Sequence, residues 1–257
     1  MKVRILGAHG LESTETRFMS VLIDGVLALD AGAISCSLSL SQQKRIKAIL
    51  LTHSHADHTM GLASLSTHAF LAGATVDAYS TKETIDAPKR HVFNGVIDPE
   101  FTITPSPERP ALKFHQIEAY KPQLIVGYTI LAFPVHHTVP AVSYQVGSED
   151  GKSLFYSGDT GSGLASHWEH VHPDLLILDC GMSNAWSAQS PKIGHMTPEL
   201  LKPELIEFRQ KKGYLPPIIL VHMALVFEDE IKGEVAELAK ELDAEISLGY
   251  EGMEIEV

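Results

Sequence analysis

The sequence contains little of what marks secreted or membrane proteins. It has two cysteines among 257 residues, Cys36 and Cys180, and they lie far apart along the chain. Such a sparse set gives no disulfide framework, so we expect reduced thiols and a cytoplasmic location. No apolar run reaches the roughly 18 residues that a membrane span needs, and the opening Met-Lys-Val-Arg lacks the pattern of a signal peptide. We therefore expect no association with a membrane.

Basic residues are also scarce. The sequence has 20 lysines and arginines against 32 aspartates and glutamates, which gives a formal net charge of −12. A surface of this charge repels polyanions, so a long nucleic acid is a disfavoured partner. A small anion is not excluded, because bound cations would dominate the electric field inside a site. The 14 histidines are, by contrast, many for this length and are a first indication of metal chemistry.

No repeat, low-complexity tract or linker divides the sequence, so we expect one domain over residues 1–257. Apolar runs bounded by turn residues predict strands at residues 3–6, 18–23, 26–29, 46–51, 76–79, 112–117, 124–133, 142–146, 153–156, 175–178 and 218–221. Helical patterns cover residues 61–71, 81–90, 197–211 and 228–242, and two short strands close the chain. Strands inside and helices outside predict an α/β fold, a four-layer αββα sandwich. The prolines between residues 99 and 110 predict a loop or an extended arm over the core, which is a candidate homodimer contact.

The strongest local signal is the run His53-Ser54-His55-Ala56-Asp57-His58, which directly follows a predicted strand. Neutral imidazole and carboxylate oxygen are the ligands that zinc, manganese and iron accept. His53 and His55 are two residues apart in an extended segment, so both can face the same side and bind one ion. Asp57 and His58, at the turn into a predicted helix, can serve a second ion. The alternative is a polar loop that happens to be rich in histidine.

Three further predicted strands deliver candidate ligands at their carboxyl ends. One ends in His136-His137, one in Gly158-Asp159-Thr160, and one in His222. Each alone is more often a hydrogen-bonded structural residue. All three in this order, after the histidine-rich run, favour one shared metal centre.

The order of these motifs resembles that of the metallo-β-lactamase superfamily, over nearly the whole chain. The resemblance implies the αββα fold of that family and two divalent metal ions, zinc or manganese, with iron as a further option. It implies ligands for the first ion at His53, His55 and His137, for the second at Asp57, His58 and His222, and a bridging ligand at Asp159. His136 competes with His137 for its place. We prefer His137 because the segment 137–144 resembles that of ribonuclease Z-type enzymes, and Asp30 matches an aspartate that the family uses structurally.

The resemblance further implies a phosphodiesterase in which a metal-bridging hydroxide attacks phosphorus and Asp57 helps to orient it. Superfamily phosphodiesterases carry a histidine in a setting similar to Gly194-His195-Met196-Thr197-Pro198. His195 would then steady the phosphate or protonate the leaving oxygen, a role that suits an imidazole near neutral pH. The alternative is a surface histidine beside the cap of a helix.

Two branches of phosphodiesterases resemble the chain. Ribonuclease Z inserts a tRNA-gripping arm between its third histidine and its Gly-Asp-Thr, but residues 138–158 leave no room for one. The class II cyclic-nucleotide phosphodiesterases resemble the chain at residues 81–94 and 194–198. Departures lie at Asp98, where an aromatic residue is expected, and at Met223-Ala224.

The sequence therefore favours a small anionic phosphodiester as substrate, a 3′,5′-cyclic nucleotide such as cyclic AMP. The alternatives are a ribonuclease Z-like or other phosphodiesterase and an acyl hydrolase that acts on a thioester or lactone. Candidates for lining the pocket are His91, Phe93 and Asn94, and the alternative is that they form the end of an amphipathic helix that packs on the core. Candidates for stacking a base are Trp186 and Phe227. Aromatic residues are more often part of a core.

Overall fold

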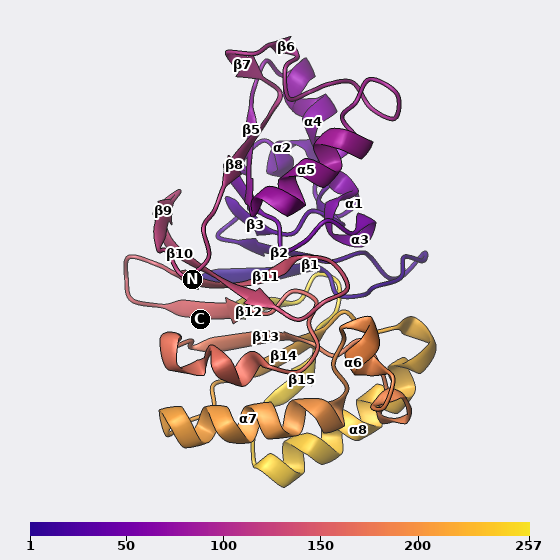
Figure 1. Ribbon diagram of the computed structural model, residues 1–257, viewed down its shortest axis with the longest axis vertical. Helices are drawn as coiled ribbons and strands as arrows, with labels where there is room; N and C mark the ends of the chain where they lie inside the picture. Colours follow the sequence, from indigo (N-terminus) through magenta and orange to yellow (C-terminus); the bar gives the residue numbers. More distant parts are fainter.

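Two seven-stranded sheets pack face to face, and helices cover the outer side of each (Figure 1). The computed structural model describes residues 1–257. In Figure 1 the helices that precede residue 92 lie beside the first sheet, and α7 (Pro198–Lys212) and α8 (Glu228–Leu242) lie beneath the second. The predicted αββα sandwich is confirmed. No helix combines the length and the apolar composition needed to cross a membrane.

The first sheet has the strand order β16-β1-β2-β3-β4-β5-β8. Its strands are β1 (Lys2–Gly7), β2 (Ser20–Ile23), β3 (Leu27–Leu29), β4 (Ala48–Leu50), β5 (Val76–Ser80), β8 (Leu112–Gln116) and β16 (Glu254–Glu256). The pairs from β16 to β3 are antiparallel, and those from β3 to β8 are parallel. The parallel strands therefore end at one edge of the sheet.

The second sheet has the strand order β15-β14-β13-β12-β11-β10-β9. Its strands are β9 (Gln123–Ile125), β10 (Tyr128–Val135), β11 (Ala141–Gly147), β12 (Ser153–Tyr156), β13 (Leu175–Asp179), β14 (Ile218–Val221) and β15 (Ile246–Leu248). The pairs from β9 to β12 are antiparallel, and those from β12 to β15 are parallel. Because β10 runs parallel to β12, the ends of β10, β12, β13 and β14 meet at one edge.

Short helices link the strands and cover the first sheet. They are α1 (Ile34–Ser37), α2 (Leu40–Gln43), α3 (Ala56–Thr59), α4 (Gly61–Leu71) and α5 (Lys82–His91). A further short helix, α6 (Ser190–Ile193), lies on the side of the second sheet (Figure 1). Four 3₁₀ turns, η1 (Leu164–Ser166), η2 (Trp168–His170), η3 (Asn184–Trp186) and η4 (Leu225–Phe227), and a small hairpin of β6 (Pro105–Ser106) and β7 (Arg109–Pro110) complete the fold. A core of 43 buried residues fills the space between the sheets, and 19 more pack between the first sheet and its helices.

One sequence prediction needs correction. The single strand predicted at residues 124–133 is wrong, because β9 and β10 form a hairpin there. Its turn places Val126 and Gly127 at φ 52° and 86°, in the left-handed region that no strand can continue through. The segment 94–110 lies over the core at Phe101, as predicted, because Phe101 is 3% exposed and its carbonyl accepts a hydrogen bond from the Leu112 amide.

The first prediction concerns Glu204, a buried carboxylate on α7. Its two oxygens accept hydrogen bonds from the amides of Gly163 and Ala165, both at 2.6 Å, and so fix the loop after β12. Glu204→Ala should lower the free energy of unfolding by roughly 1–3 kcal/mol, because charged hydrogen bonds are lost and their donors stay unpaired. Chemical denaturation measures the change. Glu207→Ala on the same helix removes only an exposed pair with Lys211 and should change it by less than about 0.5 kcal/mol; equal effects would contradict the assignment.

Candidate metal centre

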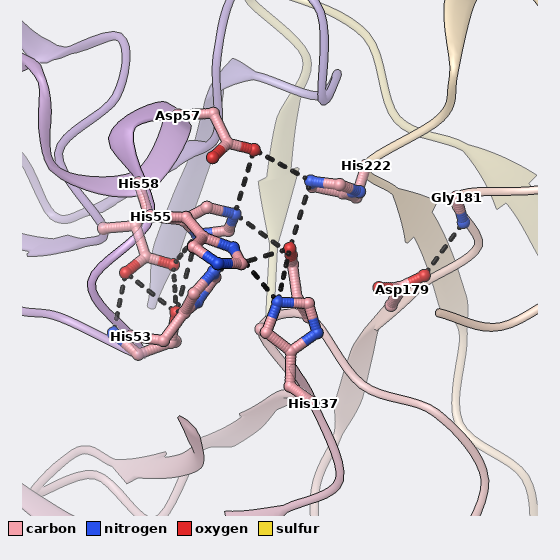
Figure 2. Close-up of polar contacts among 12 residues, drawn as sticks. His53, His55, Asp57, His58, His137, Asp179, Gly181 and His222 are labelled. Carbon is pink, nitrogen blue, oxygen red and sulfur yellow. Dashed lines mark hydrogen bonds and ion pairs between the residues drawn. The ribbon is translucent and has the colours of Figure 1, made fainter. Parts of the chain in front are cut away.

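Seven side chains from both sheets converge at the edge where the strands end (Figure 2). All seven are the ligands proposed from the sequence: His53, His55, Asp57, His58, His137, Asp159 and His222. They follow β4, β10, β12 and β14 or lie in α3. The structure brings them together, and their binding of metal stays a prediction.

The side chains form two groups that share Asp159. In each group one ligand atom from each residue lies within 4.8 Å of all the others. The groups are His53, His55, His137 and Asp159 on one side, and Asp57, His58, His222 and Asp159 on the other. This is the division that the resemblance implied.

Asp159 lies between the two groups. Its Oδ2 is 3.6 Å from Nε2 of His53, 3.8 Å from Nε2 of His137 and 3.2 Å from Nε2 of His222. Its Oδ1 is 3.0 Å from Nε2 of His58. Two ligands that each lie about 2.1 Å from a common cation are themselves about 3.0–3.4 Å apart. The separations to His58 and His222 lie in this range, and those to His53 and His137 exceed it by 0.2–0.4 Å.

Hydrogen bonds fix which ring nitrogen carries the proton. Thr52 Oγ1 has one hydrogen and donates it to Asp30, so at 3.0 Å it accepts from His53 Nδ1. His58 Nδ1 donates to Asp30 Oδ2 at 2.8 Å, and His137 Nδ1 donates to the Gly194 carbonyl at 2.9 Å. A neutral imidazole has one N–H, so His53 and His137 present a bare Nε2 to the cluster. Burial alone would lower the pKa of His58, but Asp159 and Asp30 raise it well above its usual range, so a cation at His58 Nε2 would displace a proton.

These ring nitrogens meet the requirements of a metal site. Nε2 of His53 and of His58 is buried and has no hydrogen-bond partner in the protein. Burial holds the pKa of His53 well below its usual range, so the ring is neutral and able to ligate. Burial alone would raise the pKa of Asp159, but His222 and His58 hold it well below its usual range. Neutral imidazoles around an ionised carboxylate are a donor set for divalent zinc or manganese.

Asp30 holds the ligand loop in place from the rim of the first sheet. The fully buried carboxylate accepts from the Thr52 amide at 2.7 Å, the Thr52 hydroxyl, His58 Nδ1 and, at 2.8 Å, the Tyr156 hydroxyl. Asp30 itself adopts φ 57°, a left-handed conformation that Asp and Asn tolerate better than other side chains. Such partners orient metal ligands and set their tautomers.

His222 and Gly194 show how the backbone shapes the site. His222 adopts φ 68° directly after β14, a conformation that is strained for a histidine and that turns its ring towards Asp57. Gly194, at φ 70°, ends α6, and a Cβ there would lie 2.7 Å from His137 Nδ1. Only glycine therefore allows the Gly194 carbonyl to approach and orient the His137 ring.

His195 lies beside the cluster and is held by Asp179. Its Nδ1 donates to Asp179 Oδ2 at 2.8 Å, and its ring stacks on His222 with centroids 4.8 Å apart. Burial alone would lower the pKa of His195, but the charge and hydrogen bond of Asp179 raise it to about 9. The amides of Gly181 and Met196 in turn fix Asp179 Oδ1. Nε2 is then the ring nitrogen of His195 that is free to meet a substrate.

The structure also separates residues that the sequence left as alternatives. His136 is exposed, whereas the neighbouring His137 reaches the cluster. Phe93 is 2% exposed in the core beneath the helices, and Asn94 Oδ1 accepts from the amides of Val96 and Ile97. Of the two alternatives, the structure supports a helix end that packs on the core for Phe93 and a role in the local turn for Asn94. Asp179 was missed, although it follows a buried strand as the other site residues do.

Residues 20–223 match the model of the Beta-lactamase superfamily domain, and the chain belongs to this superfamily. Two curated relatives have names that indicate phosphodiester chemistry. A "Probable 3′,5′-cyclic-nucleotide phosphodiesterase" of Yersinia pestis is 25% identical over 197 residues, which cover 68% of this chain and 55% of the relative. A ribonuclease Z of Pyrococcus abyssi is 28% identical over 165 residues, 60% of this chain and 50% of the relative. The chain spans about half the length of these relatives.

Solved structures share the fold over the whole chain. Unliganded yeast PDE1 superimposes with a TM-score of 0.84 at 19% identity, covering 100% of this chain and 99% of that one. The short form of human tRNase Z gives a TM-score of 0.69 at 18% identity with the same coverage. At these identities the likeness concerns the fold. The two branches that the sequence resembles are thus both found among its relatives.

The second prediction tests Asp30. Asp30→Asn keeps the size and the left-handed conformation but removes the charge that orients His58 and Thr52. We expect zinc affinity, measured by competition with a chromophoric chelator, to fall about 10- to 100-fold while circular dichroism stays unchanged. Asp24→Asn is the matched control, because Asp24 also has a positive φ, of 48°, but lies in an exposed turn. Unchanged affinity in Asp30→Asn would show that this carboxylate does not organise the ligands.

Proposed function

We propose that the chain is a metal-dependent phosphodiesterase that hydrolyses a small phosphodiester, with a 3′,5′-cyclic nucleotide such as cyclic AMP as the favoured substrate. One observation carries the proposal: two groups of ligand atoms share Asp159, and the His195–Asp179 pair lies directly beside them. The combination supplies sites for two cations and a proton donor around one point. The names of the curated relatives support phosphodiester chemistry.

The donor set fits two divalent ions, zinc or manganese, with iron as a further option. His53, His55 and His137 would hold one, Asp57, His58 and His222 the other, and Asp159 both. When bound, such a pair polarises a phosphoryl group and makes water acidic enough to act as a nucleophile near neutral pH. The remaining steps depend on protein side chains.

Asp57 is placed to orient the attacking water. Its Oδ2 is 3.1 Å from His222 Nε2 and 3.6 Å from His58 Nε2, and its side chain is 20% exposed to solvent. A carboxylate that is an acceptor only can receive a hydrogen bond from the water and fix its direction towards phosphorus. The water oxygen forms the new bond to phosphorus as the bond to the ester oxygen breaks.

His195 is placed to protonate the leaving oxygen. Asp179 holds Nδ1, so the proton on Nε2 is the one that can be donated, and the charged pair with Asp179 stabilises the protonated ring before transfer. An alkoxide leaves slowly unless it receives a proton, whereas an acyl substrate can depend less on this donor. His195 therefore favours a phosphodiester over a thioester or lactone.

The third prediction concerns turnover. Protein loaded with manganese or zinc should hydrolyse bis(p-nitrophenyl) phosphate and cyclic AMP. Asp159→Ala should lose both activities, and His195→Ala should lower kcat by about 10²- to 10⁴-fold, because general acid catalysis is removed. His170→Ala, which changes an exposed histidine away from the cluster, should match the wild type. Hydrolysis of the aryl diester but not of cyclic AMP would contradict the cyclic nucleotide as substrate. Hydrolysis of thioesters alone would contradict the assignment as a phosphodiesterase.

The fourth prediction concerns metal content. Elemental analysis of zinc-loaded protein should give two ions per chain. His137→Ala should give about one, because one group loses a ligand, whereas His136→Ala should keep two since that ring is exposed. Equal metal content in the two variants would contradict the assignment of His137.

A further inference from the structure

The loops that carry His195 and His222 form one surface beside the metal centre. The Met182 amide donates to the Met196 carbonyl at 3.2 Å, and the Ala224 amide donates to the Gly181 carbonyl at 3.0 Å. Figure 1 places α6 and the start of α8 at the right-hand edge of the molecule, across from α3. The loops after β13 and β14 are thus bonded to each other and to the segment that leads into α7.

Two aromatic residues lie on these loops. Trp186 ends η3, and Phe227 ends η4, five residues after His222. Their ring centroids are 5.7 Å apart at an angle of 48°, so the two rings do not stack flat on each other. Trp186 is 38% exposed, whereas the other tryptophan, Trp168, is fully buried. A large, partly exposed aromatic side chain on the loop that leads to His195 is available to a ligand.

Other exposed apolar side chains lie in the loops around the same centre. Their exposed fractions are Leu11 50%, Met60 58%, Leu225 38% and Val226 74%. Met60 lies two residues after His58, and Leu11 follows Gly10, whose Cα approaches the His222 ring closely. The loops around the centre therefore carry exposed apolar side chains among polar and acidic ones.

The charges of these loops also argue against a polynucleotide as substrate. Arg17 is bonded to the carbonyls of Ser13 and Thr16, and Lys192 is the only other basic residue in the loops 8–19, 180–197 and 222–228. A protein that follows a polynucleotide backbone needs several basic contacts to successive phosphates. Beyond the proposed cations this surface offers only Lys192, so it suits a substrate with a single phosphate.

We propose that Trp186 and Phe227 bind a flat aromatic group that is attached to the phosphate, and that the substrates are small aromatic phosphoesters with one phosphate group. The inference rests on the proposed phosphodiesterase function and names the substrate class of that site. A nucleobase and an aryl ester share this chemistry. Trp186 and Phe227 act as specificity determinants and take no part in bond breaking.

The binding test uses tryptophan fluorescence, which does not depend on turnover. Zinc-loaded protein is quenched with acrylamide in the presence of phenyl phosphate or methyl phosphate. Phenyl phosphate should shield Trp186 from the quencher and methyl phosphate should not, while the buried Trp168 gives a constant background. Equal quenching with the two esters would overturn the proposal.

The kinetic test separates KM from kcat. Phenyl phosphate should inhibit hydrolysis of bis(p-nitrophenyl) phosphate at least tenfold more strongly than methyl phosphate does. Trp186→Ala and Phe227→Ala should each raise KM for the aryl diester about tenfold, the size of a lost stacking contact, with kcat within threefold of the wild type. Tyr214→Ala is the matched control, because Tyr214 is also 38% exposed but lies after α7, where its hydroxyl donates to the Pro173 carbonyl.

The outcomes separate this proposal from the one on which it rests. If diesters are hydrolysed but the two variants keep the wild-type KM, the aromatic subsite is wrong and the phosphodiesterase stands. If no diester is hydrolysed but phenyl phosphate still shields Trp186, the subsite stands and the phosphodiesterase is wrong. If cyclic AMP is hydrolysed and a cyclic ribose phosphate without a base inhibits as strongly as phenyl phosphate does, the aromatic subsite is also wrong.

Discussion

The site depends on one constraint: buried ring nitrogens face one another without hydrogen-bond partners in the protein. His53 and His58 each use Nδ1 in a hydrogen bond and keep Nε2 without such a partner inside a closed cluster. An unsatisfied buried polar atom costs about 1–3 kcal/mol, so the arrangement lowers stability unless cations bind between the ligands. We infer that the fold tolerates this cost because the same nitrogens supply the proposed function. Asp159, whose Oδ2 lies 3.2–3.8 Å from histidines of both groups, is the point at which both sets of ligands meet.

Asp30 links the cluster to both sheets through hydrogen bonds. It accepts hydrogen bonds from Thr52 and His58, which follow β4 of the first sheet, and from Tyr156, which ends β12 of the second. One buried carboxylate therefore ties the ligand loop to the strand that delivers Asp159. His195 and Asp179 form a comparable pair on the other side of the cluster. The Gly181 amide donates to Asp179, and Asp179 in turn accepts a hydrogen bond from His195 Nδ1 and so orients the His195 ring.

Much of the fold could be predicted from the sequence because its elements have strong local patterns. The helix α8 has the predicted bounds, and the predicted cap at Thr197 is confirmed by its hydrogen bond to the Leu200 amide. The metal-centre residues could be proposed because each follows a buried strand, and parallel strands end at one edge. Asp179 could not be predicted, because a single carboxylate at the end of a strand belongs to no recognisable motif. The β9–β10 turn was missed because the left-handed conformation of Val126 is dictated by tertiary packing rather than by its residue type.

The central claim is that the cluster holds two metal ions, and anomalous diffraction from zinc-loaded crystals tests it most directly. The account predicts two peaks about 3.5–4 Å apart. One should be surrounded by His53, His55 and His137, the other by Asp57, His58 and His222, and Asp159 should contact both. A single peak, or peaks away from Asp159, would contradict the account of a shared two-metal site.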